Sequence, residues 1–267
     1  LPSDNFPLSD EVINQKGFEV SSQKLLKLLN KTKISISNDE TRHYLNGIYL
    51  HKTKLENKSF LCGVATDSHR LSSSSLEIDP KINIEPIILP KKTIFQLIFL
   101  LEQSSSTIKI SNNKSKIKFE INASVLISKV IDGRFPDYSK VIPKNNDKIL
   151  QIKLDEFRNS IERVATVSSD RTKGLKMNIS KDVVQLSVNN PNSGEGIENI
   201  NAKFNSNDLN ISFNSRYLTD IASQIENEFI VINLKDANSP VLINDFSDKN
   251  SFHVVMPMKI WFILQKD

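Results

Sequence analysis

Leu89–Ile121, LPKKTIFQLIFLLEQSSSTIKISNNKSKIKFEI, carries the two periodicities on which the fold prediction rests. Its first part, 89–101, places apolar residues three or four positions apart around an early proline, which is typical of an amphipathic helix. Segments 107–111 and 116–121 then alternate polar and apolar residues, as half-buried strands do. The polar residues at 111–114 predict a hairpin turn between them. This stretch therefore predicts a helix followed by antiparallel strands.

The same combination recurs along the chain. Helical periodicity appears again at 20–29, 154–165 and 213–222, each time with a Ser, Asp or Asn near the start, where capping is favoured. Strand-like alternation follows at 182–188 and 229–234. We therefore expect four similar units of one helix and several strands. Because strands outnumber helices and do not alternate with them strictly, the predicted fold class is α+β with mainly antiparallel sheets.

The pattern is interrupted once, between the second and third units. Phe135-Pro136-Asp137-Tyr138 stands there, and proline is poorly compatible with the interior of a helix or sheet. Two units on each side predict two pseudo-symmetric domains of about 130 residues each, joined near this segment.

Composition sets the class of protein. The chain has 267 residues, of which 38% are hydrophobic and 25% charged, values ordinary for a folded domain pair. No apolar run reaches the length of about 18 residues that a membrane helix needs, and no secretory signal pattern opens the chain. Cys62 is the single cysteine, so no internal disulfide can form, and we expect a cytoplasmic protein.

Charge is unevenly distributed. Residues 1–140 carry 20 Lys and Arg against 15 Asp and Glu, while residues 141–267 carry 15 against 16. A small positive excess permits contact with phosphates but is equally typical of a solvated lysine-rich surface.

The common enzyme signatures are missing from the sequence. Gly-rich phosphate loops, Gly-x-Ser-x-Gly elbows and His-Glu-x-x-His pairs do not occur, and the four histidines are scattered, so neither a metal nor a cofactor is predicted. Asp67 and His69, in Val64–Leu71, could share a strand face, but no nucleophile is identified beside them. A small hydrolase using this pair, or a non-catalytic β-rich scaffold, remains as an alternative function.

Four segments resemble the bacterial sliding clamp family, the β subunit of DNA polymerase III. They occur in the family's order and extend over 44–258: Tyr44-Leu45-Asn46-Gly47, Val64-Ala65-Thr66-Asp67-Ser68-His69-Arg70-Leu71, Ile131-Asp132-Gly133-Arg134-Phe135-Pro136-Asp137-Tyr138 and Val254-Val255-Met256-Pro257-Met258. The internal repeat agrees with the family's design, in which each domain is built from two halves of one helix and several strands.

The resemblance implies the domain identities and the function. Residues 9–137 would be the middle domain and 138–260 the C-terminal domain, with 1–8 a remnant of the link from a first domain and 261–267 an extension. In the family, three-domain protomers form a dimeric ring around duplex DNA, so a chain without the first domain is expected to be monomeric. The implied role is a DNA replication processivity factor, not an enzyme: a ring that slides and tethers a polymerase without making or breaking a bond.

The resemblance also implies a hydrophobic pocket for partner peptides, which come from the DNA polymerase III catalytic subunit, the clamp loader and other clamp-binding proteins. Aliphatic and methionine side chains suit such a groove, and a few polar groups would orient the peptide. The matching positions are Leu45, Thr66, His69, Arg70, Leu71, Pro136, Lys140, Val141, Asn214, Tyr217, Val254, Val255, Met256, Pro257 and Met258. Ser68 stands where the family usually has glycine, and Lys140 where arginine is common. Asp67, in the same motif as Ser68, is expected to brace the turn. One hypothesis for the apolar residues of 261–267 is that they cover part of the groove; the alternatives are packing elsewhere or disorder.

A second set of residues is expected to face DNA. Lys91, Lys92, His43 and Tyr44 match family positions near the duplex, although His43 replaces an aromatic residue there. Lys24, Lys27, Arg158 and Arg216 are added from the polar faces of the other predicted helices. Such residues would contact phosphates without reading the base sequence. Catalytic residues and metal ligands are not predicted.

Overall fold

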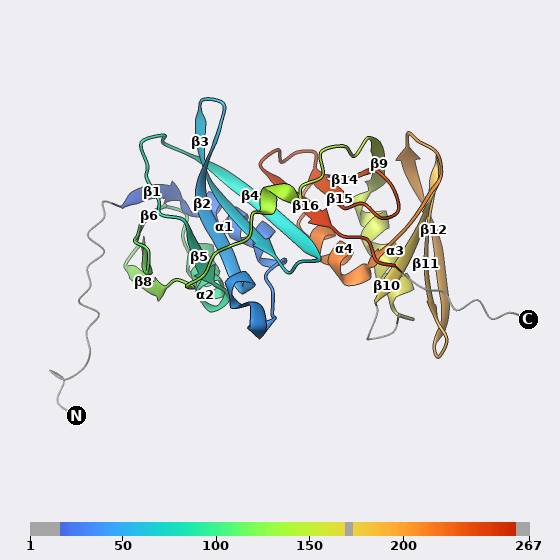
Figure 1. The fold of residues 1–267 in the computed structure, drawn as a ribbon, viewed down its shortest axis with the longest axis horizontal. Coiled ribbons are helices and arrows are strands. Elements are labelled where there is room, and N and C mark those ends of the chain that lie inside the picture. The colour runs from blue at the N-terminus through green and yellow to red at the C-terminus, as the bar shows by residue number, and fades with distance from the viewer. Residues whose placement is uncertain (1–16, 169–172, 260–267) are drawn as a thin grey trace, which may run out of the picture.

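The protein is described here by a computed structural model that covers residues 17–168 and 173–259 (Figure 1). The predictions for residues 1–8 and 261–267 lie outside these described residues. Across the described part of the chain, no helix is both long enough and apolar enough to cross a membrane.

The described elements form two lobes, the first from β1 to β8 and the second from β9 to β16. The first lobe contains β1 (Phe18–Ser21), α1 (Ser22–Lys33), the 3-10 helix η2 (Glu40–Leu45), β2 (Gly47–Leu55), β3 (Lys58–Thr66), β4 (Arg70–Ile78), β5 (Ile87–Pro90), α2 (Lys91–Glu102), β6 (Thr107–Asn112), β7 (Lys116–Ile121) and β8 (Ser124–Lys129).

A connector, residues 130–147, carries the short 3-10 helix η3 (Tyr138–Lys140) and leads to the second lobe. The second lobe contains β9 (Lys148–Lys153), α3 (Leu154–Ala165), β10 (Gly174–Ile179), β11 (Val183–Asn190), β12 (Gly194–Phe204), β13 (Leu209–Asn214), α4 (Ser215–Ala222), β14 (Phe229–Leu234), β15 (Val241–Asp245) and β16 (Ser251–Val255).

The four predicted helices are confirmed, and local sequence explains their starts. The side chain of Ser21 caps α1 by accepting from the backbone N–H of Lys24, and that of Asn214 caps α4 by accepting from Arg216. Pro90 precedes α2, where its fixed φ suits a helix start. Each helix is also preceded by a short strand that the sequence analysis did not predict, so the repeating unit is β-α-β-β-β.

The sheets are antiparallel throughout, as predicted, but their composition is not local. β1 pairs with β6 and lies in one sheet with β7 and β8, whereas β5 pairs with β2 and lies in the sheet of β3 and β4. The first strand of each half therefore belongs to the sheet of the other half. The exchange interlocks the two halves around one core.

Each lobe has its own hydrophobic core between helices and sheets. In the first lobe, Leu25 and Leu28 of α1 pack with Leu97 of α2 and Phe119 of β7, and all four are fully buried. Phe157 of α3 and Phe213 of β13 have the same place in the second lobe. Each such side chain contributes about 1.5–3 kcal/mol through burial.

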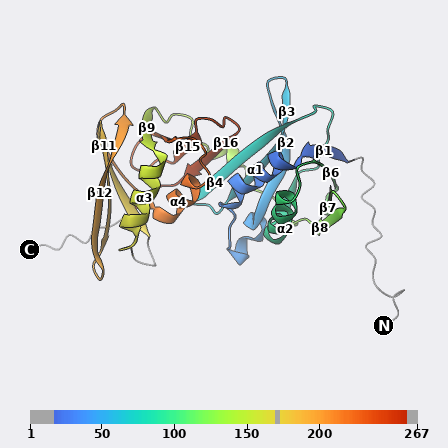
Figure 2. The same cartoon turned by 180° about the vertical axis from the view of Figure 1, so that it is seen from behind.

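The lobes are joined by a continuous strand pairing. β16 of the second lobe pairs antiparallel with β4 of the first, with Val254 opposite Leu71 and His253 opposite Ser72. This pairing joins sheets of both lobes into one 12-stranded sheet. Figure 2 shows α1, α2, α3 and α4 on one face of the molecule, while the connector crosses the opposite face in Figure 1.

Candidate functional site

The loop between β3 and β4 is built by its own polar side chains. Asp67 Oδ1 accepts from the backbone N–H groups of His69 (2.9 Å) and Arg70 (3.0 Å). Thr66 Oγ1 donates to the carbonyl of Arg70 at 2.7 Å. The interpretation of Asp67 as a residue that braces the turn is therefore confirmed.

Ser68 lies at the tip of this loop in a left-handed backbone conformation, with φ of +77°. Glycine is the residue that adopts this region at little cost, which explains why a glycine suits the position. The hydroxyl of Ser68 accepts from Nη1 of Arg42 at 2.6 Å, and Nε of Arg42 donates to Asp39 at 2.8 Å. The serine thus ties the loop to η2.

A cavity of about 230 Å³ lies between the two lobes, and we call it the junction cavity. Strand ends of both lobes and the connector form its walls, because the β4–β16 pairing places Leu71 beside Val254. Nine of the fifteen predicted pocket residues line it: Leu45, Thr66, His69, Arg70, Leu71, Pro136, Val141, Val254 and Met256. The remaining wall comes from Ser68, Asp137 and Tyr138.

The apolar part of the wall is partly open to solvent. Met256 is 39% exposed and Val141 47% exposed, whereas Leu45, Leu71 and Val254 are buried at the base. The backbone N–H of Met256 donates to the carbonyl of His69 at 2.8 Å, which fixes the end of β16 against the loop of the first lobe. The cavity therefore has a fixed apolar base and exposed apolar edges.

Three predicted residues at or just after the end of β16 are not part of the cavity lining. Val255 alternates with Val254 along β16, so its side chain points to the other face and packs in the core of the second lobe. Met258 follows the strand, and its backbone N–H donates to the carbonyl of Ser212 at 2.7 Å. Pro257, between the two methionines, is not part of the lining either.

Three more predicted residues lie beside the cavity. Asn214 uses its side chain to cap α4. Lys140 is exposed on η3 and forms an ion pair with Asp137 at 3.6 Å. Tyr217 stacks against the guanidinium of Arg70, whose central carbon lies 4.4 Å from the ring centre, and its ring also faces His69.

Arg70 connects the cavity rim to both lobes. Its Nε donates to Asp67 of the same loop at 3.1 Å, and its Nη1 donates to Asp220 of α4 at 2.7 Å. Burial, together with the charge of Asp67, raises the pKa of the Tyr217 phenol above its ordinary value, so this phenol remains protonated. Sequence reasoning missed Asp220, because it lies 150 positions from Arg70. An acidic residue on a distant helix gives no sign of which cation it contacts.

The connector wall is held by aromatic contacts. The rings of Phe135 and Tyr49 stack at 4.9 Å, and the hydroxyl of Tyr138 lies 3.0 Å from Nε2 of His51. Burial and the neighbouring Cys62 thiol raise the pKa of Tyr138. Tyr138 was quoted in the motif that carried the resemblance, so its presence in the wall could have been predicted.

The arrangement does not support the hydrolase alternative. Both oxygens of Asp67 are engaged by the loop backbone and by Arg70. The ring of His69 faces Tyr217 instead of Asp67. Within the described residues, no group of three or more His, Cys, Asp or Glu side chains is placed to hold a metal ion.

The predicted DNA-facing residues differ in their contacts. Lys24, Lys92, Arg158 and Arg216 lie on the four helices, and in the described part of the chain their side chains form no ion pair or hydrogen bond. In contrast, Lys27 pairs with Glu226 and Asp248, and Lys91 donates to the side chain of Asn38. His43 and Tyr44 lie in η2, where Nε2 of His43 is 3.2 Å from the carbonyl of Asp132.

Comparison with known families agrees with both lobes. Residues 19–137 match the family model of the DNA polymerase III beta subunit, central domain, and residues 139–259 match that of the C-terminal domain.

Individual relatives agree as well. The beta sliding clamp of Caulobacter vibrioides is 34% identical over 261 residues, which cover 97% of this chain and 70% of the relative. That of Escherichia coli is 30% identical over 260 residues, again 97% of this chain and 70% of the relative.

Solved structures extend the likeness to the fold. A DnaN sliding clamp from Bartonella birtlesii, bound to griselimycin, superposes with a TM-score of 0.93 at 38% identity. The match covers 97% of this chain and 70% of that one. The predicted fold class, two domains of paired helix-and-strand halves, is confirmed by this match. The chain belongs to the family of DNA polymerase III beta subunits, the beta sliding clamps.

Proposed function

We propose that this chain serves DNA replication as a sliding clamp, part of a ring around duplex DNA that tethers DNA polymerase III and other clamp-binding proteins. The observation that carries the tethering role is the junction cavity, which has a buried apolar base and exposed apolar edges. Concave sites of this kind suit an apolar anchor side chain of a docked peptide.

The cavity supports recognition of an extended peptide with neighbouring leucine and phenylalanine side chains. Leu71 and Val254 form an apolar base for such anchors, and Met256 is flexible enough to adapt to their shape. His69 and Arg70 add polar groups at the rim, where they would orient the peptide backbone. Partners would be the polymerase catalytic subunit, the clamp loader and other proteins that carry such a peptide.

The helical face supports contact with DNA. Lys24, Lys92 and Arg216 project from three different helices, which lie together on one face (Figure 2). Exposed cations distributed in this way attract phosphates without a preferred base sequence, which permits sliding. The proposed action is topological and not catalytic, because tethering raises the effective concentration of the polymerase at its template. A cytoplasmic location belongs to this proposal.

Titration calorimetry with a short Gln-x-x-Leu-Phe peptide tests the tethering role. We expect saturable binding in the micromolar range, about 8 kcal/mol of binding free energy. Met256→Ala should weaken it strongly because this side chain forms part of the cavity wall. Val125→Ala, on exposed β8 and away from the cavity, is the matched control and should bind as tightly as the unmodified chain. Absence of saturable binding to the unmodified chain would contradict the proposal.

A further inference from the structure

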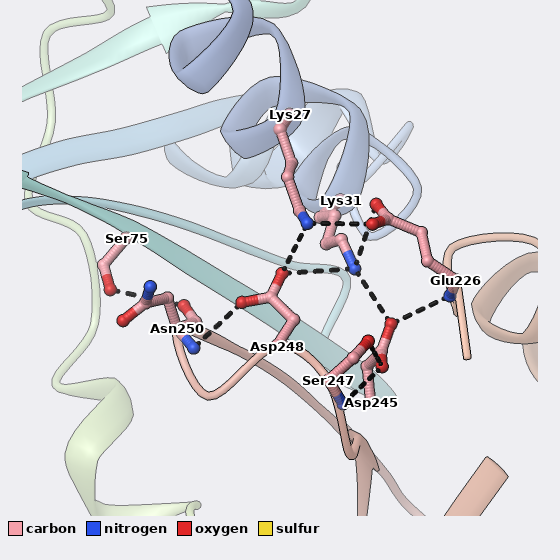
Figure 3. A network of polar contacts seen from close by, with 8 residues as sticks. All are labelled: Lys27, Lys31, Ser75, Glu226, Asp245, Ser247, Asp248 and Asn250. Carbon is pink, nitrogen blue, oxygen red and sulfur yellow. Dashed lines mark hydrogen bonds and ion pairs between the residues drawn. The ribbon is translucent and has the colours of Figure 1, made fainter. Parts of the chain in front are cut away.

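A buried lysine connects the two lobes on the helical side of their junction. The ammonium of Lys31, on α1, lies 3.3 Å from Asp248, 3.5 Å from Asp245 and 3.6 Å from Glu226 (Figure 3). Its side chain is only 3% exposed. Lys27, one helical turn earlier, pairs with Glu226 at 2.9 Å and with Asp248 at 3.3 Å. We call these five residues the Lys31 cluster.

All three carboxylates of the cluster belong to the second lobe, and those of Asp245 and Asp248 are also held there by other hydrogen bonds. Asp245, at the end of β15, accepts from the backbone N–H of Glu226 at 2.8 Å and from the hydroxyl of Ser247. Asp248, in the following turn, accepts from the backbone N–H of Asn250 at 3.0 Å. The three carboxylates form an acidic socket, in which Asp245 and Asp248 are held in place, and α1 of the first lobe inserts its lysine into it (Figure 3).

The junction cavity and the Lys31 cluster lie on opposite faces of the same strand pair. Leu71 and Val254 face each other across β4 and β16 and line the cavity. The next pair, Ser72 and His253, points to the helical side, because side chains alternate along a strand. Nδ1 of His253 lies 2.8 Å from the hydroxyl of Ser72, which in turn contacts Ser35 at 2.6 Å.

The charge balance makes the socket dependent on its lysine. Without Lys31, Asp245 and Asp248 would remain buried, with side chains 0% and 9% exposed and Lys27 as the nearest cation of the cluster. Removing one partner of a buried ion pair is costly, because the remaining charge is neither hydrated nor compensated. Moving the second lobe away from α1 would admit water and relieve the repulsion in the empty socket.

We propose that Lys31 is a positioning residue for peptide binding: by seating α1 in the acidic socket it fixes the angle between the lobes, and so holds the two walls of the junction cavity together. This inference rests on the proposed peptide-binding function. Lys31 itself lies on the far side of the strand pair and does not touch the peptide. Its effect passes through the β4–β16 pairing, on which both walls depend.

Lys31→Met tests the proposal, because methionine keeps the apolar stem and removes the charge. We expect peptide affinity to fall about tenfold, the loss that follows when only about a tenth of the molecules hold the docked arrangement. Lys33→Met is the matched control: Lys33 is on the same helix but donates to Asn30 of its own lobe. Its affinity for the peptide should equal that of the unmodified chain.

A distance measurement separates positioning from simple stability. Spin labels at Lys54→Cys and Lys181→Cys, both exposed and in different lobes, report the lobe-to-lobe distance by pulsed electron resonance. The distribution should broaden in Lys31→Met and narrow again when saturating peptide is added. A lower melting temperature with unchanged peptide affinity and unchanged distances would overturn the proposal.

Rescue gives a second line of evidence that does not depend on the single variant folding well. Asp248→Asn keeps the shape of the socket and removes one negative charge. It should therefore lower the affinity for the peptide less than Lys31→Met does. Lys31→Met combined with Asp248→Asn should recover part of the affinity, because fewer uncompensated charges remain. An additive loss in the double variant would contradict the mechanism. If the unmodified chain binds no peptide, the proposed function fails, while the distances still decide whether Lys31 sets the lobe angle.

Discussion

At the scale of single residues, Ser68 combines an unfavourable backbone conformation with a useful hydrogen bond. Its φ of +77° favours glycine, while its hydroxyl accepts from Arg42. We predict that Ser68→Gly is more stable than Ser68→Ala by about 1 kcal/mol, because alanine keeps the left-handed strain and glycine removes it. Urea unfolding of the two variants measures the difference directly. Equal stabilities would show that the loop changes conformation when the hydroxyl is lost.

The burial of His253 leads to a prediction of how the free energy of unfolding depends on pH. Complete burial, with Lys31 and Arg70 as nearby cations, lowers the pKa of this histidine to about 3, although Asp245 and Asp248 oppose the shift. The folded protein thus holds the imidazole neutral, while the unfolded chain binds a proton near pH 6.5. Stability should therefore fall by about 1.4 kcal/mol for each pH unit below that value.

The contribution of His253 can be isolated between pH 7.5 and pH 5. Although burial opposes it, hydrogen bonds from Ser247 and the Glu226 backbone lower the pKa of Asp245, so this carboxylate remains ionised throughout the window. We predict that the unmodified chain loses about 2 kcal/mol of unfolding free energy over it. His253→Gln should lose clearly less, although burial also lowers the pKa of His51 and leaves a smaller slope in both proteins. Identical slopes in urea titrations would contradict this assignment.

Predictability from sequence differed between residues according to the range of their contacts. Asp67 was correctly interpreted as a bracing residue, because the groups that it contacts lie two or three positions away. Lys31 gave no comparable signal: its carboxylate partners lie about two hundred positions away, and a lysine on a helix is normally solvated. Long-range ion pairs cannot be predicted from local pattern.

At the scale of elements, periodicity located the helices well and the strand partners poorly. The predicted helix at 154–165 coincides with α3, and the predicted strand at 229–234 coincides with β14. Both depend on local spacing of apolar residues. The pairing of β1 with β6 could not be predicted, because each strand presents a similar alternating face and the choice depends on how the two halves interlock.

The cavity residues likewise differ in how well local pattern could have placed them. Alternation along β16 could have separated Val254 from Val255, since consecutive residues of a strand point to opposite faces. The sequence resemblance named both valines, because a motif does not distinguish lining residues from the core residues between them. Tyr217 was likewise named as a pocket position, although in the structure it supports Arg70 from beside the cavity.

At the scale of the whole molecule, the two proposed binding surfaces lie on opposite faces of the joined sheet. Pro136, Asp137 and Tyr138 of the connector line the cavity, and the connector crosses the face opposite the four helices (Figure 1 and Figure 2). A partner peptide and DNA could then be held at the same time without competing for surface. The Lys31 cluster lies between the two faces, so a change of lobe angle would alter both.

The helical face gives the last prediction, on binding to duplex DNA. We predict that binding is independent of base sequence. The logarithm of the association constant should fall linearly with the logarithm of salt concentration, with a slope of about 0.9 for each phosphate neutralised. Lys92→Ala combined with Arg216→Ala should reduce the slope by about 1.8, because two exposed cations are removed from α2 and α4. Lys54→Ala combined with Lys181→Ala removes the same charge away from the helices and is the matched control. Fluorescence anisotropy over a series of salt concentrations measures the slopes of both double variants. An equal decrease in the two slopes would mean that net charge, not the helical face, governs contact with DNA.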